Sequence, residues 1–480
     1  MKTIKHLLLT LIASFLLLSC EEWLDVSPGK QVKSQDMLQN EAGFRDALIG
    51  IYSTMAETNI YGAQATFATM DVIAQYYSAS IVISATGYPS AYNFIYDGPD
   101  AEYIINGMWN TDYYAIANCN NILDNIDAKK DIFSKGVYEM VKAETMALRA
   151  FLHLDLLRFF GPIPIQDNMS KPAIPIMVTL TDVPPKQSSI SEVVGFVLKE
   201  LDEARTLIAP YDLLGPGFDE YVDEYSVSSF TPGNEHYDDG GFRLYRRSRF
   251  NYYGMTALMA RAALWAGQNA VALRYAQEVI NAGKFPLMDE NIYNTSNNLV
   301  VWHTANEYIT SLYINQMDVR IHNAYFARTS PRVCFSAGDL AVLFGSDMDF
   351  DWRYRKFIGL NESGQWNIPL KYQNSTSMRM PLLKIGEMFL IAAEASGDIS
   401  YLNTLRTHRG YINNPLPSDT DIGVALTNEY RREFFAEGQL FSFYKRRNVS
   451  QFHNGKAAGE SVFVLPMPDN EIEFGNIITE

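Results

Sequence analysis

The sequence contains little cysteine. Its 480 residues include only Cys20, Cys119 and Cys334, and none of them belongs to a C-x-x-C pair. Three cysteines cannot form the disulfide framework of a small secreted scaffold, and zinc sites normally need closely spaced ligand pairs. Since 47% of the residues are hydrophobic, a chain of this length can bury a large apolar core without such staples. We therefore expect a fold held by packing, with no structural metal and no cofactor.

Positive charge is scarce as well. Lysine and arginine number 39 against 55 acidic residues, which gives a formal net charge of -16. A surface of this sign repels the phosphates of nucleic acids. The composition therefore excludes a nucleic-acid partner.

The common catalytic signatures are missing. The chain has no G-x-S-x-G, H-E-x-x-H, Walker A or G-x-G-x-x-G pattern, and these patterns mark the usual nucleophile, zinc and nucleotide sites. The histidines show no ligand spacing, and His153 lies on an apolar helical face, so we expect it in the core. A glycoside hydrolase stays open, because its two carboxylates need only be close in space.

One acidic run resembles a calcium loop. Asp347, Asp349 and Asp351 alternate as calcium ligands do, but an EF-hand needs glycine at the sixth position and glutamate at the twelfth, where this chain has Trp352 and Ile358. The alternatives are a solvated acidic loop or a helix-terminal charge near Arg353. Whether the three aspartates hold a metal is left open by the sequence.

The N-terminus has the pattern of an export signal. Lys2 and Lys5 precede an apolar stretch over 7–18, which is too short to span a membrane. The residues 17–20, Leu-Leu-Ser-Cys, resemble the bacterial lipoprotein box, which predicts a cleaved signal peptide over 1–19 and acylation of Cys20. Three acyl chains would anchor the protein stably. The alternative is an unmodified signal peptide with a chance cysteine.

Helical periodicity dominates the rest of the chain. Apolar residues recur at steps of three and four, and Ser189-x-x-Glu192 forms a capping box before one such run. Ala260, Ala272 and Ala276 have the small-residue spacing of degenerate tetratricopeptide-type repeats, although ordinary helix hairpins would look similar. The periodic segments predict helices over 44–55, 109–123, 143–157, 194–208, 253–264, 271–280, 382–395, 401–409 and 428–447.

Long segments rich in tyrosine, glycine, proline and asparagine separate these helices. They cover 74–103, 160–188, 210–248, 284–380 and 410–426. Loops of this length are usually functional or locally structured.

Several blocks in a fixed order resemble the SusD/RagB family. They include the lipoprotein box followed by Trp-Leu-Asp-Val-Ser-Pro over 23–28, the run 143–151 ending in Phe-Gly-Pro-Ile-Pro at 160–164, and Arg-Arg-Glu-Phe over 431–434. The resemblance implies an all-α fold, in which four tetratricopeptide-like helix pairs support an irregular ligand-binding face. It also implies one domain over 20–480, with an N-terminal part over about 20–210 and a C-terminal part over about 250–480.

The same resemblance implies a function. Such proteins are outer-membrane lipoproteins that face the cell exterior, bind a glycan without being enzymes, and deliver it to a SusC-like TonB-dependent transporter. Some relatives capture peptides, so peptide import is the alternative. Sugar rings stack on aromatic side chains, and we therefore expect ligand contacts from the loop tyrosines, each of which could equally be a packing or transporter contact. The candidates, chosen by position, are Tyr76, Tyr77, Tyr88, Tyr92, Tyr308 and Tyr313, whereas Trp109 and Trp302 are assigned to the core.

Overall fold

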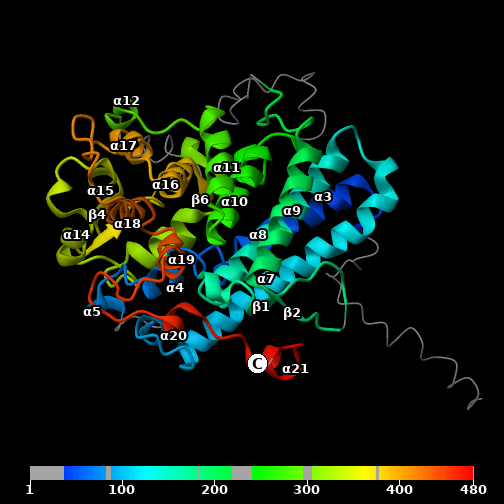
Figure 1. Cartoon of the computed structure of the whole chain (residues 1–480), viewed down its shortest axis with the longest axis horizontal. Coiled ribbons are helices and arrows are strands. Elements are labelled where there is room, and N and C mark those ends of the chain that lie inside the picture. The colour runs from blue at the N-terminus through cyan, green and yellow to red at the C-terminus, as the bar shows by residue number, and fades with distance from the viewer. Residues whose placement is uncertain are drawn as a thin grey trace, which may run out of the picture.

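A computed structural model describes residues 37–82, 88–181, 183–218, 241–295, 305–373 and 378–478. The predicted signal peptide, Cys20 and Trp302 lie outside these ranges. In Figure 1 the described chain forms an elongated body, with α14, α15 and α18 at one end and α3 and α9 at the other.

Four long helices build the N-terminal half. They are α3 (Glu41–Met55), α7 (Pro99–Ile126), α8 (Val137–Phe160) and α9 (Ile190–Ile208). The capping box expected at Ser189 and Glu192 opens α9, because each side chain bonds the other's backbone amide. α8 ends immediately before Gly161-Pro162. α3 packs on α7, and α8 packs on α9.

The C-terminal half continues the series of packed helices. Here α10 (Tyr252–Trp265) packs on α11 (Asn269–Asn281), and α16 (Ile385–Ser396) packs on α17 (Ile399–Thr407). The halves join because α10 contacts α9, and within the C-terminal half α11 contacts α16. The expected all-α, mainly helical fold is confirmed.

One predicted helix is divided in two. The run expected as a single helix over 428–447 consists of α18 (Ile422–Glu433) and α19 (Gln439–Arg446). Between them Ala436 and Gly438 have φ values of 60° and 75°. A Cβ at Gly438 would lie 2.5 Å from the Cα of Thr66. The break therefore lets a neighbouring segment approach the backbone directly, which helical periodicity does not reveal.

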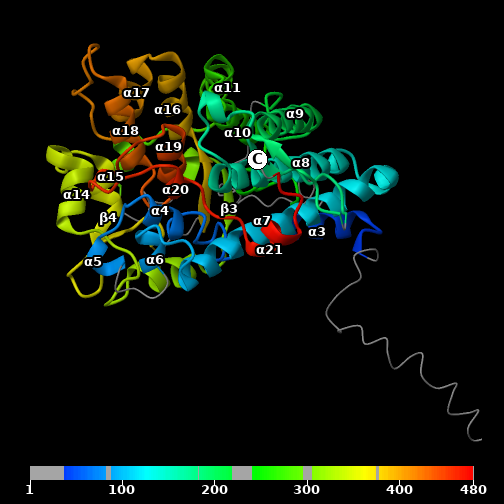
Figure 2. The same ribbon diagram turned by 60° about the horizontal axis from the view of Figure 1, so that its bottom comes forward.

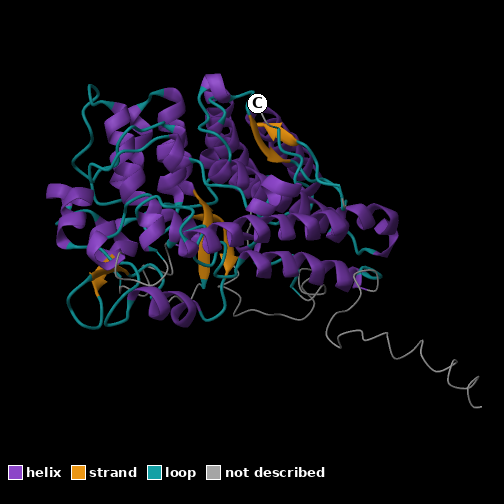
Figure 3. Cartoon of the chain, turned by 90° about the horizontal axis from the view of Figure 1, so that it is seen from below, coloured by secondary structure: helices purple, strands orange, loops and turns teal. Residues whose placement is uncertain are grey.

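The strands in the described residues form three antiparallel pairs (Figure 3). β1 (Pro172–Pro175) pairs with β2 (Gln187–Ser189), β3 (Tyr308–Tyr313) with β6 (Arg379–Lys384), and β4 (Ile358–Leu360) with β5 (Asn367–Pro369). The segment 382–384 was expected to begin a helix, but it ends β6, and α16 starts only at Ile385. A short apolar run fits either structure by periodicity alone.

Short helices lie between and after these elements, several of them within the expected loop segments. They are α4 (Thr69–Ile73), α5 (Ala79–Val82), α6 (Pro89–Tyr92), α12 (Glu290–Tyr293), α14 (Ala337–Phe344), α15 (Trp352–Phe357), α20 (Glu460–Phe463), α21 (Asp469–Phe474), the π-helix η5 (Asp318–Phe326), and the 3₁₀ turns η1 (Asp127–Ile132), η2 (Gln166–Asn168), η3 (Arg246–Ser248), η4 (Ala305–Glu307) and η6 (Gly345–Asp347).

A single hydrophobic cluster extends through both halves, from Leu38 to Leu465. It includes most of the segment that follows α3, where Phe67, Met70 and Ile73 are completely buried. Figure 2 shows α4 and α6 against the body beside the long helices. None of the described helices combines the length and apolarity needed to cross a membrane.

Candidate functional site

A hollow of about 590 Å³ opens between the first half of α7 and the turn that follows α3. We call it the amide hollow, because four of its lining side chains are carboxamides. It is lined by Thr58, Asn59, Gln64, Pro99, Glu102, Tyr103, Ile104, Asn106, Gly107 and Asn110.

The start of α7 fixes one wall of this hollow. Gly98 precedes the helix and Pro99 occupies its first turn, where a missing backbone N–H costs nothing. Tyr103, Asn106 and Asn110 follow at steps of three and four, so they share one helical face. The adjoining face carries Trp109, which is buried as expected and packs edge-to-face on Phe160.

The turn after α3 fixes the other wall. A Cβ at Gly62 would lie 2.4 Å from the carbonyl oxygen of Ala56, so the tight turn requires glycine there. The Asn59 amide donates to the Thr111 hydroxyl across 2.7 Å, which joins the turn to α7. The Thr69 hydroxyl donates to the Gln64 side-chain oxygen across 2.7 Å. These bonds hold two of the carboxamides in place before any ligand arrives.

The chemistry of the amide hollow suits a neutral polyhydroxyl ligand. Tyr103 is 83% exposed, so nearly its whole ring is presented to solvent. Carboxamides donate and accept hydrogen bonds at once, as hydroxyl groups do. Among the described residues that line the hollow, only Glu102 is charged. Glycosidases normally use a pair of carboxylates, and this lining offers one.

Comparison with known proteins matches the N-terminal part of the chain to one family. Residues 22–212 match the model of a SusD-like family described as "Starch-binding associating with outer membrane". SusD-like protein P25 of Formosa agariphila is 26% identical over 164 residues, which cover 34% of this chain and 31% of the relative. Over residues 22–212 the chain is therefore similar to SusD-like proteins. The aligned part spans about a third of that relative's length.

Solved structures share the fold over almost the whole chain. A putative sugar-binding protein from Bacteroides vulgatus matches with a TM-score of 0.68 and 19% identity, covering 92% of this chain and 98% of its own. A laminarin-binding SusD-like protein matches with a TM-score of 0.63 and 16% identity, again over 92% and 98%. The SusD-like fold therefore includes the C-terminal half, which the family model does not cover.

Four of the predicted tyrosines are packed inside this SusD-like fold. Tyr76, Tyr77, Tyr88 and Tyr92 are each less than 5% exposed. The Tyr76 hydroxyl donates to the carbonyl of Arg431, and the Tyr77 hydroxyl donates to that of Phe67, each across 2.7 Å. Burial raises the pKa of all four phenols. Their rings offer almost no surface to a ligand in the free chain.

The structure places Tyr88 directly behind the amide hollow. Its hydroxyl accepts a long bond of 3.5 Å from the Gln64 amide, so it contacts the lining without reaching the space. Tyr308 is 8% exposed and adjoins a buried ion cluster. Tyr313, at the end of β3, is 55% exposed and lies on a second hollow. Of the six candidates, only Tyr313 presents a ring to solvent.

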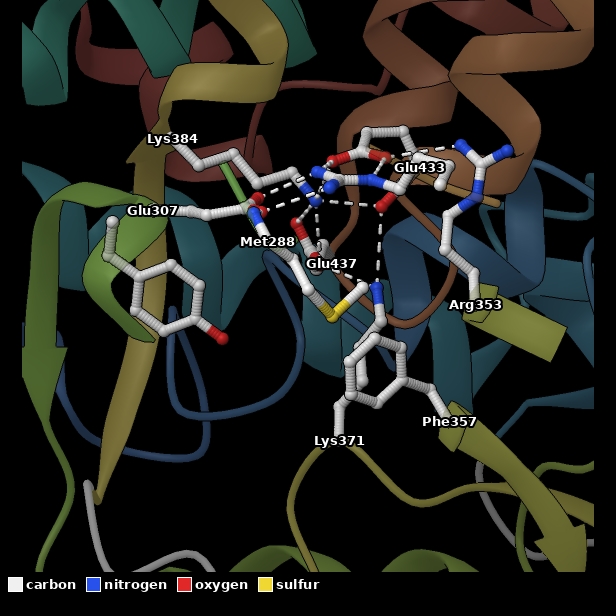
Figure 4. Close-up of a pocket in the computed structure, with 10 residues that line it drawn as sticks. Met288, Glu307, Arg353, Phe357, Lys371, Lys384, Glu433 and Glu437 are labelled. Atoms are coloured by element: carbon white, nitrogen blue, oxygen red, sulfur yellow. Dashed lines mark hydrogen bonds and ion pairs between the residues drawn. The ribbon is translucent and has the colours of Figure 1, made fainter. Parts of the chain in front are cut away.

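The ion cluster beside Tyr308 encloses a cavity of only about 30 Å³, room for one or two water molecules. Figure 4 shows Lys371 and Lys384 converging on Glu433 and Glu437. Arg409 contacts Glu433 at 2.8 Å and Glu307 at 2.6 Å. Burial alone would raise the pKa of Glu433, but Arg409 and Lys384 hold it well below its usual value. We infer from the paired charges and the small volume that this cluster stabilises the fold, and we call it the structural lock.

Other ion pairs join the helices, and they involve Glu387, Glu394, Arg406, Arg432 and Glu437. Arg261 contacts Glu387, Arg446 contacts Glu394, Arg406 contacts Glu429, Arg432 contacts Asp347 and Lys384 contacts Glu437.

Asp347 and Asp351 of the acidic run also form ion pairs within the fold. Asp351 caps α15 through the Arg353 amide and pairs with its guanidinium at 2.7 Å. This is the helix-terminal alternative. The described residues contain no group of three metal-ligating side chains.

The lining of the amide hollow was missed from the sequence because α7 begins at Pro99, ten residues before the first apolar residue used to predict that helix. Tyr103 was therefore counted as the last residue of a loop. When the helix is taken to begin at Pro99, Tyr103, Asn106 and Asn110 form one stripe, which borders the buried face that carries Trp109. An aromatic ring on an otherwise polar helical face is the signal that could have found them.

Proposed function

We propose that this SusD-like protein binds a neutral oligosaccharide in the amide hollow and does not act on it chemically. One observation carries the proposal: the exposed Tyr103 ring stands beside Asn106 and Asn110 on one helical face. A sugar has apolar faces that stack on such a ring, and hydroxyl groups that pair with carboxamides. The family description as starch-binding supports the same ligand class.

The proposal extends to location and partner. A lipid on Cys20 of the mature chain, 20–480, would hold the protein at the outer membrane, facing the cell exterior. The lipoprotein-box pattern and the family description as outer-membrane-associated support this placement. The bound glycan would then pass to a SusC-like TonB-dependent transporter. Isolation of the protein with such a transporter from solubilised outer membranes is the expected result, and recovery of the protein alone would count against the partnership.

The binding test is calorimetric titration with malto-oligosaccharides, β-1,3-gluco-oligosaccharides and other neutral plant and microbial glycans. We expect binding to at least one series and about fivefold weaker binding after Tyr103→Ala, since aromatic stacking contributes roughly 1 kcal/mol. Tyr114→Ala is the matched control, because Tyr114 is also on α7 and 62% exposed but does not line the hollow. Equal loss in both variants would contradict the assignment of Tyr103.

Two results would replace the proposal altogether. Binding of short peptides without binding of any glycan would favour peptide capture by the same fold. Release of shortened sugars during long incubation would indicate a glycoside hydrolase. We expect neither, because the lining of the amide hollow has a single carboxylate and no cationic side chain among the described residues.

A further inference from the structure

A second hollow, of about 610 Å³, lies along α3 and is bordered by the segment 241–249 and the end of β3. We call it the tyrosine hollow, because Tyr245 and Tyr313 line it and are 47% and 55% exposed. Asp46, Ile49 and Ser53 border it from α3. The lining differs from that of the amide hollow, because it carries Arg45, Asp46 and Arg249 instead of carboxamides. Its two exposed rings can still stack on a sugar, and its hydroxyl and charged groups can bond the sugar's hydroxyl groups.

The wall of the tyrosine hollow is fixed before any ligand binds. The guanidinium groups of Arg45 and Arg249 lie 4.7 Å and 4.2 Å from the centre of the Phe242 ring. Arg249 is buried and donates to the Phe242 carbonyl. These contacts hold the Phe242 ring in place, so it forms a fixed apolar wall instead of a mobile loop side chain.

Tyr245 has an unusual backbone. Its φ of 58° and ψ of 35° are left-handed, a conformation that costs a bulky residue free energy. Packing of the side chain does not explain this conformation, since nearly half of the side chain is exposed to solvent. The strained backbone therefore presents an aromatic ring at the edge of a hollow.

Residues that are close in the sequence line both hollows. Asp46, Ile49 and Ser53 lie at steps of three and four, so they form one exposed stripe of α3. Thr58, which lines the amide hollow, follows Ser53 by five residues. Their Cα atoms are therefore separated by at most about 18 Å. A short oligosaccharide can cover that distance.

We propose that the tyrosine hollow is a second carbohydrate subsite, which binds a further part of the same neutral glycan chain held in the amide hollow. This inference rests on the proposed function. Joining two weak sites through one ligand raises the affinity, because the second contact becomes intramolecular. The protein then binds long glycan chains more tightly than short ones, and Tyr245 and Tyr313 are the residues responsible for this preference.

The test is titration of malto- and β-1,3-gluco-oligosaccharides of increasing length into the full protein. For a chain long enough to reach both hollows, Tyr313→Ala is expected to weaken binding about fivefold. The same variant leaves the binding of the shortest oligosaccharide that still binds unchanged. Tyr313→Phe keeps the ring and should retain the affinity for long chains.

Tyr245 needs a different substitution, because alanine is also strained in the left-handed region. Tyr245→Asn removes the ring and tolerates this backbone, and we expect it to reproduce the length-dependent loss. Unchanged circular dichroism would show that both variants fold. Tyr114→Ala is again the control and should have no effect at any length.

Failure of this inference differs from failure of the proposed function. If Tyr103→Ala weakens every length while the Tyr245 and Tyr313 variants weaken none, the amide hollow stands and the second subsite is refuted. Loss of short-chain binding in the Tyr313 variant would also refute it, because the two hollows would then not act as separate subsites. If neither series binds to the unaltered protein, both proposals fall together for these glycans.

Discussion

Acid should destabilise this protein through one buried histidine. His153 in α8 is fully buried, as expected for a core residue. Its Nδ1 lies 2.8 Å from the Arg149 carbonyl, and its Nε2 lies 3.0 Å from the amide nitrogen of Met177. Only a neutral ring can donate to the first and accept from the second. Burial accordingly lowers the pKa of His153 to about 4.

The magnitude follows from linkage. An exposed histidine in the unfolded chain has a pKa of about 6.5, so the unfolded state binds the proton first as the pH falls. The stabilisation is fully present above about pH 6.5 and is lost as the pH falls to about 4. With 1.36 kcal/mol for each pKa unit, the full loss is about 3 kcal/mol.

The assay is urea unfolding of the unaltered protein and of His153→Gln at several pH values. The variant has no ionisable ring, so its deficit in the free energy of unfolding should shrink by about 3 kcal/mol between pH 7 and pH 4. His453, whose pKa burial also lowers to about 4, is present in both proteins and cancels in the difference. A deficit that stays constant with pH would refute this reasoning.

Two further predictions concern the scaffold and the anchor. Glu433→Gln should lower the free energy of unfolding by about 3–5 kcal/mol, because it removes the charge that faces buried Arg409 and Lys384. The control is Glu203→Gln, because Glu203 is exposed. Equal stability of the two variants in urea would contradict the stabilising role of the ion cluster. Cys20→Ser should abolish incorporation of labelled fatty acid in a lipoprotein-producing bacterium, and persistent labelling would place the anchor elsewhere.

The helical scaffold could be predicted because its signals are local. The capping box at Ser189 satisfies backbone amides within one turn, and Gly161-Pro162 ends α8 where it stands in the sequence. The helix boundaries that were predicted wrongly depend on contacts with residues far away in the sequence. The break at Gly438 exists because Thr66 approaches its backbone, and no periodic pattern encodes a neighbour hundreds of residues away.

The candidate site was harder to predict for a related reason. Tyrosine content marks a segment as unusual but does not say which way a ring points. Tyr76 and Tyr77 are buried and donate to the backbone carbonyls of Arg431 and Phe67, whereas Tyr103 is exposed on a helix. Burial is set by the whole fold, so sequence alone could nominate tyrosine-rich segments and Tyr313 but could not separate packed rings from presented ones.

The most direct measurement is a crystal structure of the protein with a bound neutral oligosaccharide. The account predicts a sugar ring stacked on Tyr103, with its hydroxyl groups bonded to Asn106 or Asn110. A sugar bound elsewhere on the surface, with the amide hollow holding only water, would contradict it.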